Sequence, residues 1–400
     1  MSEMESKPKK PNILVRVLAL LVTAALLIGA VFLVANRDKF NLDALKRWFE
    51  YRDLKTSDTG EAAPFSHAGG DQATFAYLED GILLSSTSGV RYYSFSGETY
   101  AQEVLTLEHP TLSTAGATGV AYDVGGQNLF VFRNAQEAFR LTLDDGNSLL
   151  SARVNEAGWL AVTAQQSGYK GSVTVYNSTF DKTVIQINLS STFIMDAVLS
   201  PDSKTVAVLT LGQSNGSYES QVRFYHVDEK EPYATVSLGN LVPLDLDYES
   251  GALWVTGEDE IAIVSPNGKE TATYSLGRNY LKGCDLGGDG FAVLLLGRYR
   301  AGSANQVVTV DANGEVIATQ DLTSSVLSFD AAGRYLSLLT GDTLTIYTSD
   351  LTPYSTLEHT QNARYTALSS SGAAVSTGPS TAPIRFCTSP RSRRRSMARR

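Results

Sequence analysis

A serine and a group of acids are the residues whose spacing comes closest to known chemistry. Residues 212–216 (GQSNG) match G-x-S-x-G, which places a hydrolase serine on a strained turn between a strand and a helix. This motif stands between two strand-like stretches, so we predict a Gly/Ser/Asn-rich hairpin. Asp245, Asp247 and Glu249 resemble a calcium-binding loop, but leucines alternate with them, which favours a strand with acids on its solvent side.

The spacing of the other residues does not indicate a catalytic or cofactor site. The histidines lie far apart, and two cysteines cannot form a disulfide framework or a zinc site. Phosphate loops of the G-x-x-x-x-G-K type and dinucleotide turns of the G-x-G-x-x-G type are absent. We therefore assign no catalytic, cofactor-binding or metal-binding residue. The residues considered are His67, His109, His226, His359, Cys284 and Cys387.

The charge of the chain is distributed unevenly. Residues 56–378 hold 16 Lys/Arg and 36 Asp/Glu, a balance of −20, whereas residues 1–55 hold ten Lys/Arg and six acids. A domain this acidic repels phosphate backbones and anionic headgroups, so we expect no nucleic-acid partner.

A charge-free run predicts a membrane anchor near the N-terminus. Val17 to Ala35 are nineteen uncharged residues, which as a helix would span roughly 28 Å of hydrocarbon. The run is longer than the apolar core of a signal peptide, and no clear cleavage site follows it. We divide this region into a tail at 1–12, a single transmembrane helix at 13–36, an amphipathic juxtamembrane helix at 37–55 and a linker at 56–64.

The side of the membrane is not decided by charge, because lysines and arginines flank the run at both ends. Short N-terminal tails before such anchors commonly stay in the cytosol. We therefore expect a single-pass protein of the cell membrane whose large domain is extracytoplasmic.

A period of about forty residues determines the predicted fold. A turn residue followed by an apolar run recurs with steps of 38, 39, 46, 47, 39, 43 and 39 residues. The units contain short alternating stretches and no helical period, which is typical of four-stranded propeller blades. The eight marks are Gly81, Gly119, Gly158, Lys204, Gly251, Gly290, Gly333 and Gly372.

We therefore predict an all-β propeller of about eight four-stranded blades over residues 65–378. A lone four-stranded sheet exposes its edges and apolar faces, whereas radial stacking buries the faces between neighbours. We expect Ala63–His67 to close the ring by pairing beside the last strands. A two-sheet sandwich or two small β domains would not explain the regular steps.

The sequence also resembles a known family in several stretches, at residues 151–178 (SARVNEAGWLAVTAQQSGYKGSVTVYNS), 199–212 (LSPDSKTVAVLTLG) and 294–302 (LLLGRYRAG), and in the anchor followed by RWFEYRD. The family is an uncharacterised Gram-positive bacterial group of single-pass proteins with a WD40/TolB-like propeller. The resemblance covers most of residues 13–375 and implies architecture without a known activity.

The repeat pattern ends at Gly378. Residues 379–400 contain three prolines, seven arginines and no strand-length alternation, so we expect an incomplete eighth blade and a basic, disordered tail. A frameshift or a misread gene end would explain the change, and translation of the other reading frames would test that. The alternative is a genuine basic tail that binds an acidic surface, such as the domain itself.

Three long loops between second and third strands are the candidate binding surface. They span residues 165–172, 212–220 and 297–306 in units three, four and six. Equivalent loops of a propeller emerge on one face, and Tyr and Arg are favoured in binding hot spots, although ordinary loop variation is the plainer explanation. The candidate partner-binding residues are Tyr169, Lys170, Tyr218, Arg298, Tyr299 and Arg300.

The favoured function is a membrane-anchored, non-enzymatic scaffold for protein interactions, or a ligand sensor, at the cell envelope. The alternative is a propeller hydrolase whose site is assembled in the central channel. Acids and histidines along the channel would favour the enzyme, and Ser, Val and Leu there would favour the scaffold.

Overall fold

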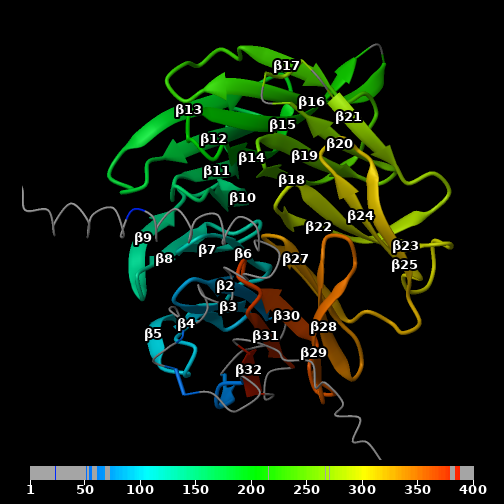
Figure 1. The fold of residues 1–400 in the computed structure, drawn as a ribbon. Helices are drawn as coiled ribbons and strands as arrows, with labels where there is room; N and C mark the ends of the chain where they lie inside the picture. Colours follow the sequence, from blue (N-terminus) through cyan, green and yellow to red (C-terminus); the bar gives the residue numbers. More distant parts are fainter. Residues whose placement is uncertain are drawn as a thin grey trace, which may run out of the picture. The chain divides into compact units, whose positions relative to one another are not determined.

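The computed structural model of the protein describes residues 23, 51, 54–55, 61–67, 73–214, 216–265, 267–269, 271–378 and 383–387. The chain divides into two units, Met1–Glu50 and Tyr51–Arg400. The second unit is an all-β propeller, in which eight four-stranded antiparallel sheets surround a common axis (Figure 1). This confirms the predicted fold class.

The predicted anchor and juxtamembrane helix lie outside the described residues, apart from Thr23, Tyr51, Leu54 and Lys55. Within the part of the chain that is described, no helix has the length and apolar character needed to cross a membrane.

The first four blades each use four consecutive strands, from the innermost to the outermost. Blade 1 contains β2 (Thr74–Leu78), β3 (Gly81–Ser86), β4 (Gly89–Tyr93) and β5 (Thr99–Glu103). Blade 2 contains β6 (Pro110–Ala115), β7 (Thr118–Asp123), β8 (Asn128–Arg133) and β9 (Gln136–Thr142). Blade 3 contains β10 (Ser148–Val154), β11 (Leu160–Gln165), β12 (Gly171–Tyr176) and β13 (Thr183–Leu189). Blade 4 contains β14 (Phe193–Leu199), β15 (Thr205–Ser214), β16 (Ser217–His226) and β17 (Ala234–Ser237).

The next three blades repeat this order. Blade 5 contains β18 (Pro243–Glu249), β19 (Ala252–Gly257), β20 (Glu260–Val264) and β21 (Thr271–Ser275). Blade 6 contains β22 (Tyr280–Gly288), β23 (Phe291–Gly297), β24 (Gln306–Asp311) and β25 (Val316–Asp321). Blade 7 contains β26 (Ser328–Ala332), β27 (Tyr335–Leu339), β28 (Thr343–Thr348) and β29 (Pro353–Glu358).

Blade 8 joins the two ends of the domain and corrects one prediction. It contains β30 (Tyr365–Leu368), β31 (Ala374–Thr377), β32 (Pro383–Cys387) and, as its outermost strand, β1 (Phe65–Ser66). The N-terminal closing strand was predicted, but the incomplete blade was wrong, because β32 lies within the expected tail. Its alternation of Ile384 and Phe386 with Arg385 is strand-like, but three prolines and the run of arginines obscured it.

Six of the eight repeat marks lie in the turn between the first and second strand of a blade, and Gly81 and Gly119 occupy the first and the second position of the second strand in their blades. At Gly158 the backbone has a φ of +76°, which L-residues rarely adopt. At Gly333 the φ is +57°, and a Cβ would come within 2.7 Å of the carbonyl oxygen of Ser370 in the next blade. A positive φ therefore favours glycine at five of the eight marks, namely Gly158, Gly251, Gly290, Gly333 and Gly372.

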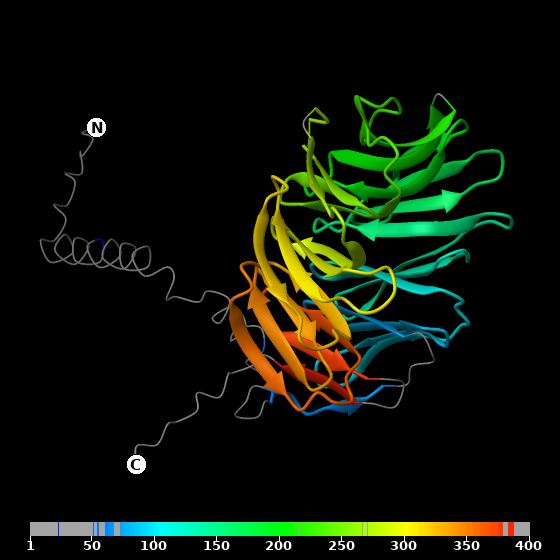
Figure 2. The same ribbon diagram turned by 90° about the vertical axis from the view of Figure 1, so that its right-hand side faces the viewer.

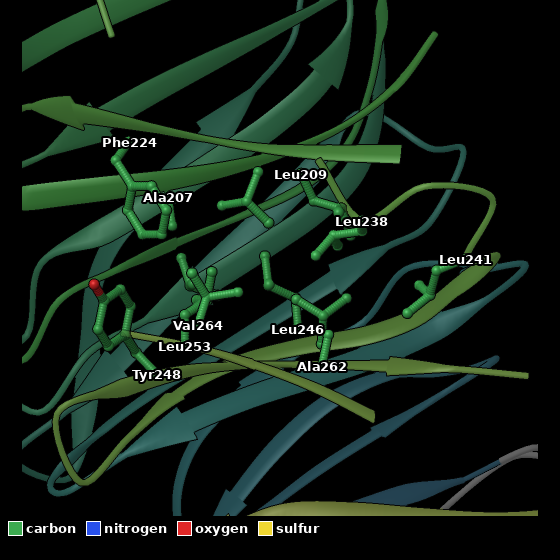
Figure 3. Close-up of a cluster of buried hydrophobic side chains, with 13 residues drawn as sticks. Ala207, Leu209, Phe224, Leu238, Leu241, Leu246, Tyr248, Leu253, Ala262 and Val264 are labelled. Atoms are coloured by element: carbon green, nitrogen blue, oxygen red, sulfur yellow. The ribbon is translucent and has the colours of Figure 1, made fainter. Parts of the chain in front are cut away.

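The core consists of apolar layers between neighbouring blades, and the described residues form eight such clusters. Figure 3 shows the layer between blades 4 and 5, where Leu209 and Phe224 face Leu246 and Leu253. Full burial of each such side chain contributes about 1.5–3 kcal/mol. A blade therefore depends on both neighbours for its stability.

Candidate functional site

The strand register defines two ends of the ring. Phe193, at the start of the innermost strand β14, pairs with Leu211 near the end of β15, and Tyr280 pairs with Gly297 in the same way. The start of each innermost strand therefore lies beside the loop that joins the second and third strands. We call this end the upper face and the opposite end the lower face; Figure 2 shows the ring from the side, with loops at both ends of the strands.

The six predicted binding residues all lie on the upper face and are exposed. Tyr169 and Lys170 belong to the β11–β12 loop, and Tyr218 lies in the β15–β16 hairpin. Residues 298–300 begin the β23–β24 loop, where Tyr299 is 76% exposed. The short blade 5 turn with Glu258 and Asp259 separates the blade 6 residues from the others.

Two contacts tie these loops to the starts of innermost strands. The Lys170 Nζ atom donates a hydrogen bond to the carbonyl oxygen of Ser191 at 3.2 Å and lies 4.8 Å from the centre of the Phe193 ring. In blade 6, the Lys282 Nζ atom donates to the carbonyl oxygen of Arg300 at 2.7 Å. The loops are thus held against the inner part of the face.

Sequence reasoning missed the apolar residues at the inner edge of this face. Of the fifteen large apolar side chains exposed in the described part of the chain, eleven lie on the upper face, counting Val104, Tyr169, Tyr218 and Tyr299. The other seven belong to the starts of innermost strands in blades 4 to 8, and we call them the rim. The rim consists of Phe193, Met195, Val242, Leu244, Tyr280, Leu327 and Tyr365.

The signal for the rim was present in the sequence but was ambiguous. Each rim residue stands near the first position of a strand that alternates apolar and other residues, so it resembles a core position. Only the register shows that these positions extend past the layer between blades.

Acids line the axis along one side of the ring. The innermost strands of blades 4 to 7 carry five aspartates and a glutamate, whereas those of blades 1, 2 and 8 carry no charged residue. Asp245 and Asp247 alternate with buried Leu246 and Tyr248, which confirms the predicted strand. The expected solvent side for the acids was wrong, because they lie along the axis, where Asp247 is desolvated, and Leu244 is the exposed side chain. The acids are Asp196, Asp245, Asp247, Glu249, Asp285 and Asp330.

One arginine from blade 3 bridges two of these acids. Arg153 Nη2 lies 2.9 Å from Asp196 Oδ2 of blade 4 and 2.6 Å from Asp245 Oδ1 of blade 5. Ser151 also donates a hydrogen bond to Asp196. Burial alone would lower the pKa of Arg153, but the nearby carboxylates outweigh this effect and raise it above its usual value. This network joins three blades at the axis.

Burial raises the pKa of each of the remaining axial acids. Asp285 of blade 6 and Asp330 of blade 7 are joined by a side-chain hydrogen bond, and burial together with the charge of Asp285 raises the pKa of Asp330 well above its usual value. Burial also raises the pKa of Asp247 to about 6. For Glu249, burial and then the charge of Asp247 raise the pKa to about 9.

The other residues that the sequence offered for chemistry are not arranged as a nucleophile or a metal site in the described part of the chain. Ser214 ends β15 and pairs with Ser217 across the hairpin, as predicted, so the G-x-S-x-G spacing does not form a nucleophile turn. Within the described residues, no group of three His, Cys, Asp or Glu side chains is arranged to hold a metal ion. Burial raises the pKa of the Cys284 thiol to about 12, which makes it a poor nucleophile.

The fold defines this protein as a β-propeller, similar in architecture to WD40 domains and BamB. The C-terminal WD40 domain of Sif2 aligns with a TM-score of 0.57 at 10% identity, covering 82% of this chain and 97% of that domain. Sqt1 from Saccharomyces cerevisiae aligns with a TM-score of 0.56 at 10% identity, covering 83% and 99%. BamB from Moraxella catarrhalis aligns with a TM-score of 0.51 at 14% identity, covering 84% and 98%.

Similarity at these identities establishes the fold alone. The chain belongs to DUF5711, a family of unknown function whose model matches residues 51–352. A search of curated protein sequences finds no match. The matched region begins at Tyr51, which packs into the propeller, and reaches the loop between β28 and β29.

Proposed function

We propose that this protein is a membrane-anchored scaffold for protein interactions, or a ligand sensor, at the cell envelope, and that its upper face binds the partner. The observation that carries the proposal is the rim. Exposed apolar side chains scattered singly need no explanation, but seven at the starts of consecutive innermost strands support an interaction surface here. Tyr and Arg side chains on the neighbouring loops add the residue types that dominate binding energies.

Photo-crosslinking in the cells that make the protein tests the binding face. A photoreactive residue is placed at Phe193, Leu244 or Tyr280 on the rim, and at the exposed lower-face positions Tyr233 and Val316 as matched controls. We expect a discrete protein adduct from the rim positions and none from the controls. Equal yields at both ends, or no adduct at the rim, would contradict the proposal.

Membrane topology is tested separately with a cysteine placed at the exposed Lys230. The native background is low because Cys387 is buried and the Cys284 thiol has its pKa raised by burial to about 12. We expect a membrane-impermeant maleimide to label the new cysteine in intact cells, because the domain lies outside. Labelling only after the cells are broken would place the domain inside.

A second candidate function is hydrolysis at the axis, because the axial wall is acidic rather than lined by Ser, Val and Leu. The specific observation is the hydrogen-bonded pair Asp285–Asp330, in which burial raises the pKa of both carboxyls, as in paired carboxylates that act as general acid and base. Against it, the Leu368 amide of blade 8 donates a hydrogen bond to Asp330 of blade 7, so the pair is also explained as part of a link between blades. The Gly287 amide donates to Asp285 within the same strand, β22.

Amide substitution distinguishes these roles. The scaffold proposal expects Asp285→Asn to leave crosslinking at Tyr280 unchanged. An enzyme would show turnover of glycoside or peptide substrates by the wild type that Asp285→Asn abolishes without loss of folding. Screening purified full-length protein against such substrates provides the measurement.

A further inference from the structure

The upper end of blade 6 carries a concentration of positive charge. Arg278 and Lys282 stand on either side of Tyr280, and Arg298 and Arg300 stand on either side of Tyr299. The Lys282–Arg300 hydrogen bond holds the strand start and the loop together. Among the described residues, none of these cations forms an ion pair, unlike Arg140, Arg153 and Lys204. We call Arg278, Lys282, Arg298 and Arg300 the blade 6 cations.

These cations adjoin the apolar part of the rim. Blades 4 and 5 expose Phe193, Met195, Val242 and Leu244 beside them, and Lys170 caps the Phe193 ring from the blade 3 loop. In a domain with a balance of −20, four unpaired cations at one blade end are a local reversal of charge. Unpaired arginines bind carboxylates strongly, and the apolar rim gains by being covered.

We infer that the partner presents an acidic segment with apolar side chains, whose carboxylates bind the blade 6 cations while its apolar residues cover the rim of blades 4 and 5. This inference rests on the proposed function, because it identifies the chemistry of the partner at the same face. Charge complementarity of this kind sets orientation and the rate of association.

A protein segment fits this face better than an anionic membrane does. Acidic loops of blades 2, 5 and 7 lie on the same face, at Asp144, Asp145, Glu258, Asp259 and Asp342. A flat anionic bilayer would have to approach these acids as well as the cations, and the net charge of the domain repels it. A narrow segment that contacts the blade 6 cations and the rim of blades 4 and 5 avoids the acids of blades 2 and 7 and meets only those of the blade 5 turn.

Selection from random short peptides displayed on phage provides the test, with the full-length protein in nanodiscs of uncharged lipid. The key variant is Arg298→Glu/Arg300→Glu, whose side chains are exposed on a loop. Its matched control is Lys230→Glu/Lys269→Glu, which makes the same charge change on the lower face. Thermal unfolding of both variants checks that folding is retained.

We expect the enriched peptides to combine Asp or Glu with apolar residues. Their affinity should fall at least ~10-fold in the Arg298/Arg300 variant and stay unchanged in the lower-face control, with weaker binding at high salt. Enrichment of neutral or basic peptides that lose affinity in Phe193→Ser would overturn this inference while leaving the upper face as the binding site.

Vesicles with anionic lipid provide the competing probe. If they bind through Arg298 and Arg300 while no peptide is enriched, both the inference and the proposed protein-binding function are wrong. If neither probe binds, the acidic-segment inference is overturned, and the crosslinking experiment decides the proposed function separately.

Discussion

Aromatic side chains are buried in one region of this molecule and exposed in another. Where blade 8 meets blade 1, Phe95 stacks on Phe386 with ring centres 4.2 Å apart, and Tyr51 packs edge-on against both. On the rim, Phe193 is 52% exposed and Tyr280 is 44% exposed. Closure of the ring accounts for the first set, whereas nothing in the fold accounts for the second.

Arginines show the same contrast. Arg153 is held between carboxylates of two other blades, while Arg298 and Arg300 stand exposed on a loop without an ion-pair partner among the described residues. Side chains at the seam and axis therefore stabilise the ring, and those of the upper face are available to another molecule. This contrast can be tested by substitutions of matched residue types.

The largest effect is expected at the seam. Phe386→Ala should lower the free energy of unfolding by about 3–5 kcal/mol, because it removes a fully buried ring from the layer between blades 8 and 1. Chemical denaturation of the full-length protein in detergent measures this loss. The control, Phe193→Ala, should change the free energy of unfolding by no more than about 0.5 kcal/mol relative to the wild type. Equal losses in the two variants would remove the distinction between seam and rim.

A somewhat smaller effect is expected at the axis. Arg153→Leu should cost about 2–4 kcal/mol, because it leaves the carboxylate of buried Asp196 without its cation. Adding Asp196→Asn should recover part of this loss, and urea unfolding of the single and double variants measures the coupling. Arg298→Leu provides the matched control and should change stability little, since its side chain is exposed.

The contribution of Glu249 to the free energy of unfolding should depend on pH. Its pKa is raised to about 9 in the folded protein, so its contribution to stability is full below the unfolded pKa near 4.5 and is lost as the pH rises through 9. Glu249→Gln should therefore match the wild type at pH 4 and exceed it by about 1–2 kcal/mol at pH 8, after allowance for water at this half-buried site. A gain that is constant across this range would contradict the raised pKa.

The smallest effect on stability is expected at the rim itself. Phe193→Ser combined with Leu244→Ser should change the free energy of unfolding by less than about 0.5 kcal/mol, since both side chains are exposed. The same variant should lose the crosslinked partner. A large loss of stability would mean that these residues belong to the core.

The sequence predicted the repeating parts of the molecule well, because the turn between the first and second strand recurs in each blade and five of the eight marks are glycines with a positive φ. The closing strand near Phe65 and the hairpin at Ser214 followed from the same reasoning. β32 could not be predicted, because its few alternating residues lie among prolines and arginines that resemble a tail. Backbone pairing with both β31 and β1 stabilises β32 as a strand, although its local sequence does not indicate one.

The candidate site was predicted in part. The loops with Tyr169 and Tyr299 were recognisable by their length, and Arg298 and Arg300 were predicted with them. The rim and the cations Arg278 and Lys282 were not predicted, since Tyr280 and Lys282 are about twenty residues before the loop that they join. The axial network could not be predicted for the same reason, because Arg153 and its hydrogen-bond partner Asp245 are 92 positions apart in the chain. Only the ring brings such residues together.

Hydroxyl-radical footprinting tests the central claim most directly, because it needs no knowledge of the partner. The modification of Phe193, Tyr280 and Tyr299 is compared between native membranes and the purified full-length protein, with lower-face Tyr233 as the reference. If a partner covers the upper face, the rim and loop aromatics should be protected in membranes while Tyr233 is modified equally in both samples. Equal modification of Tyr280 and Tyr299 in the two samples would contradict the account.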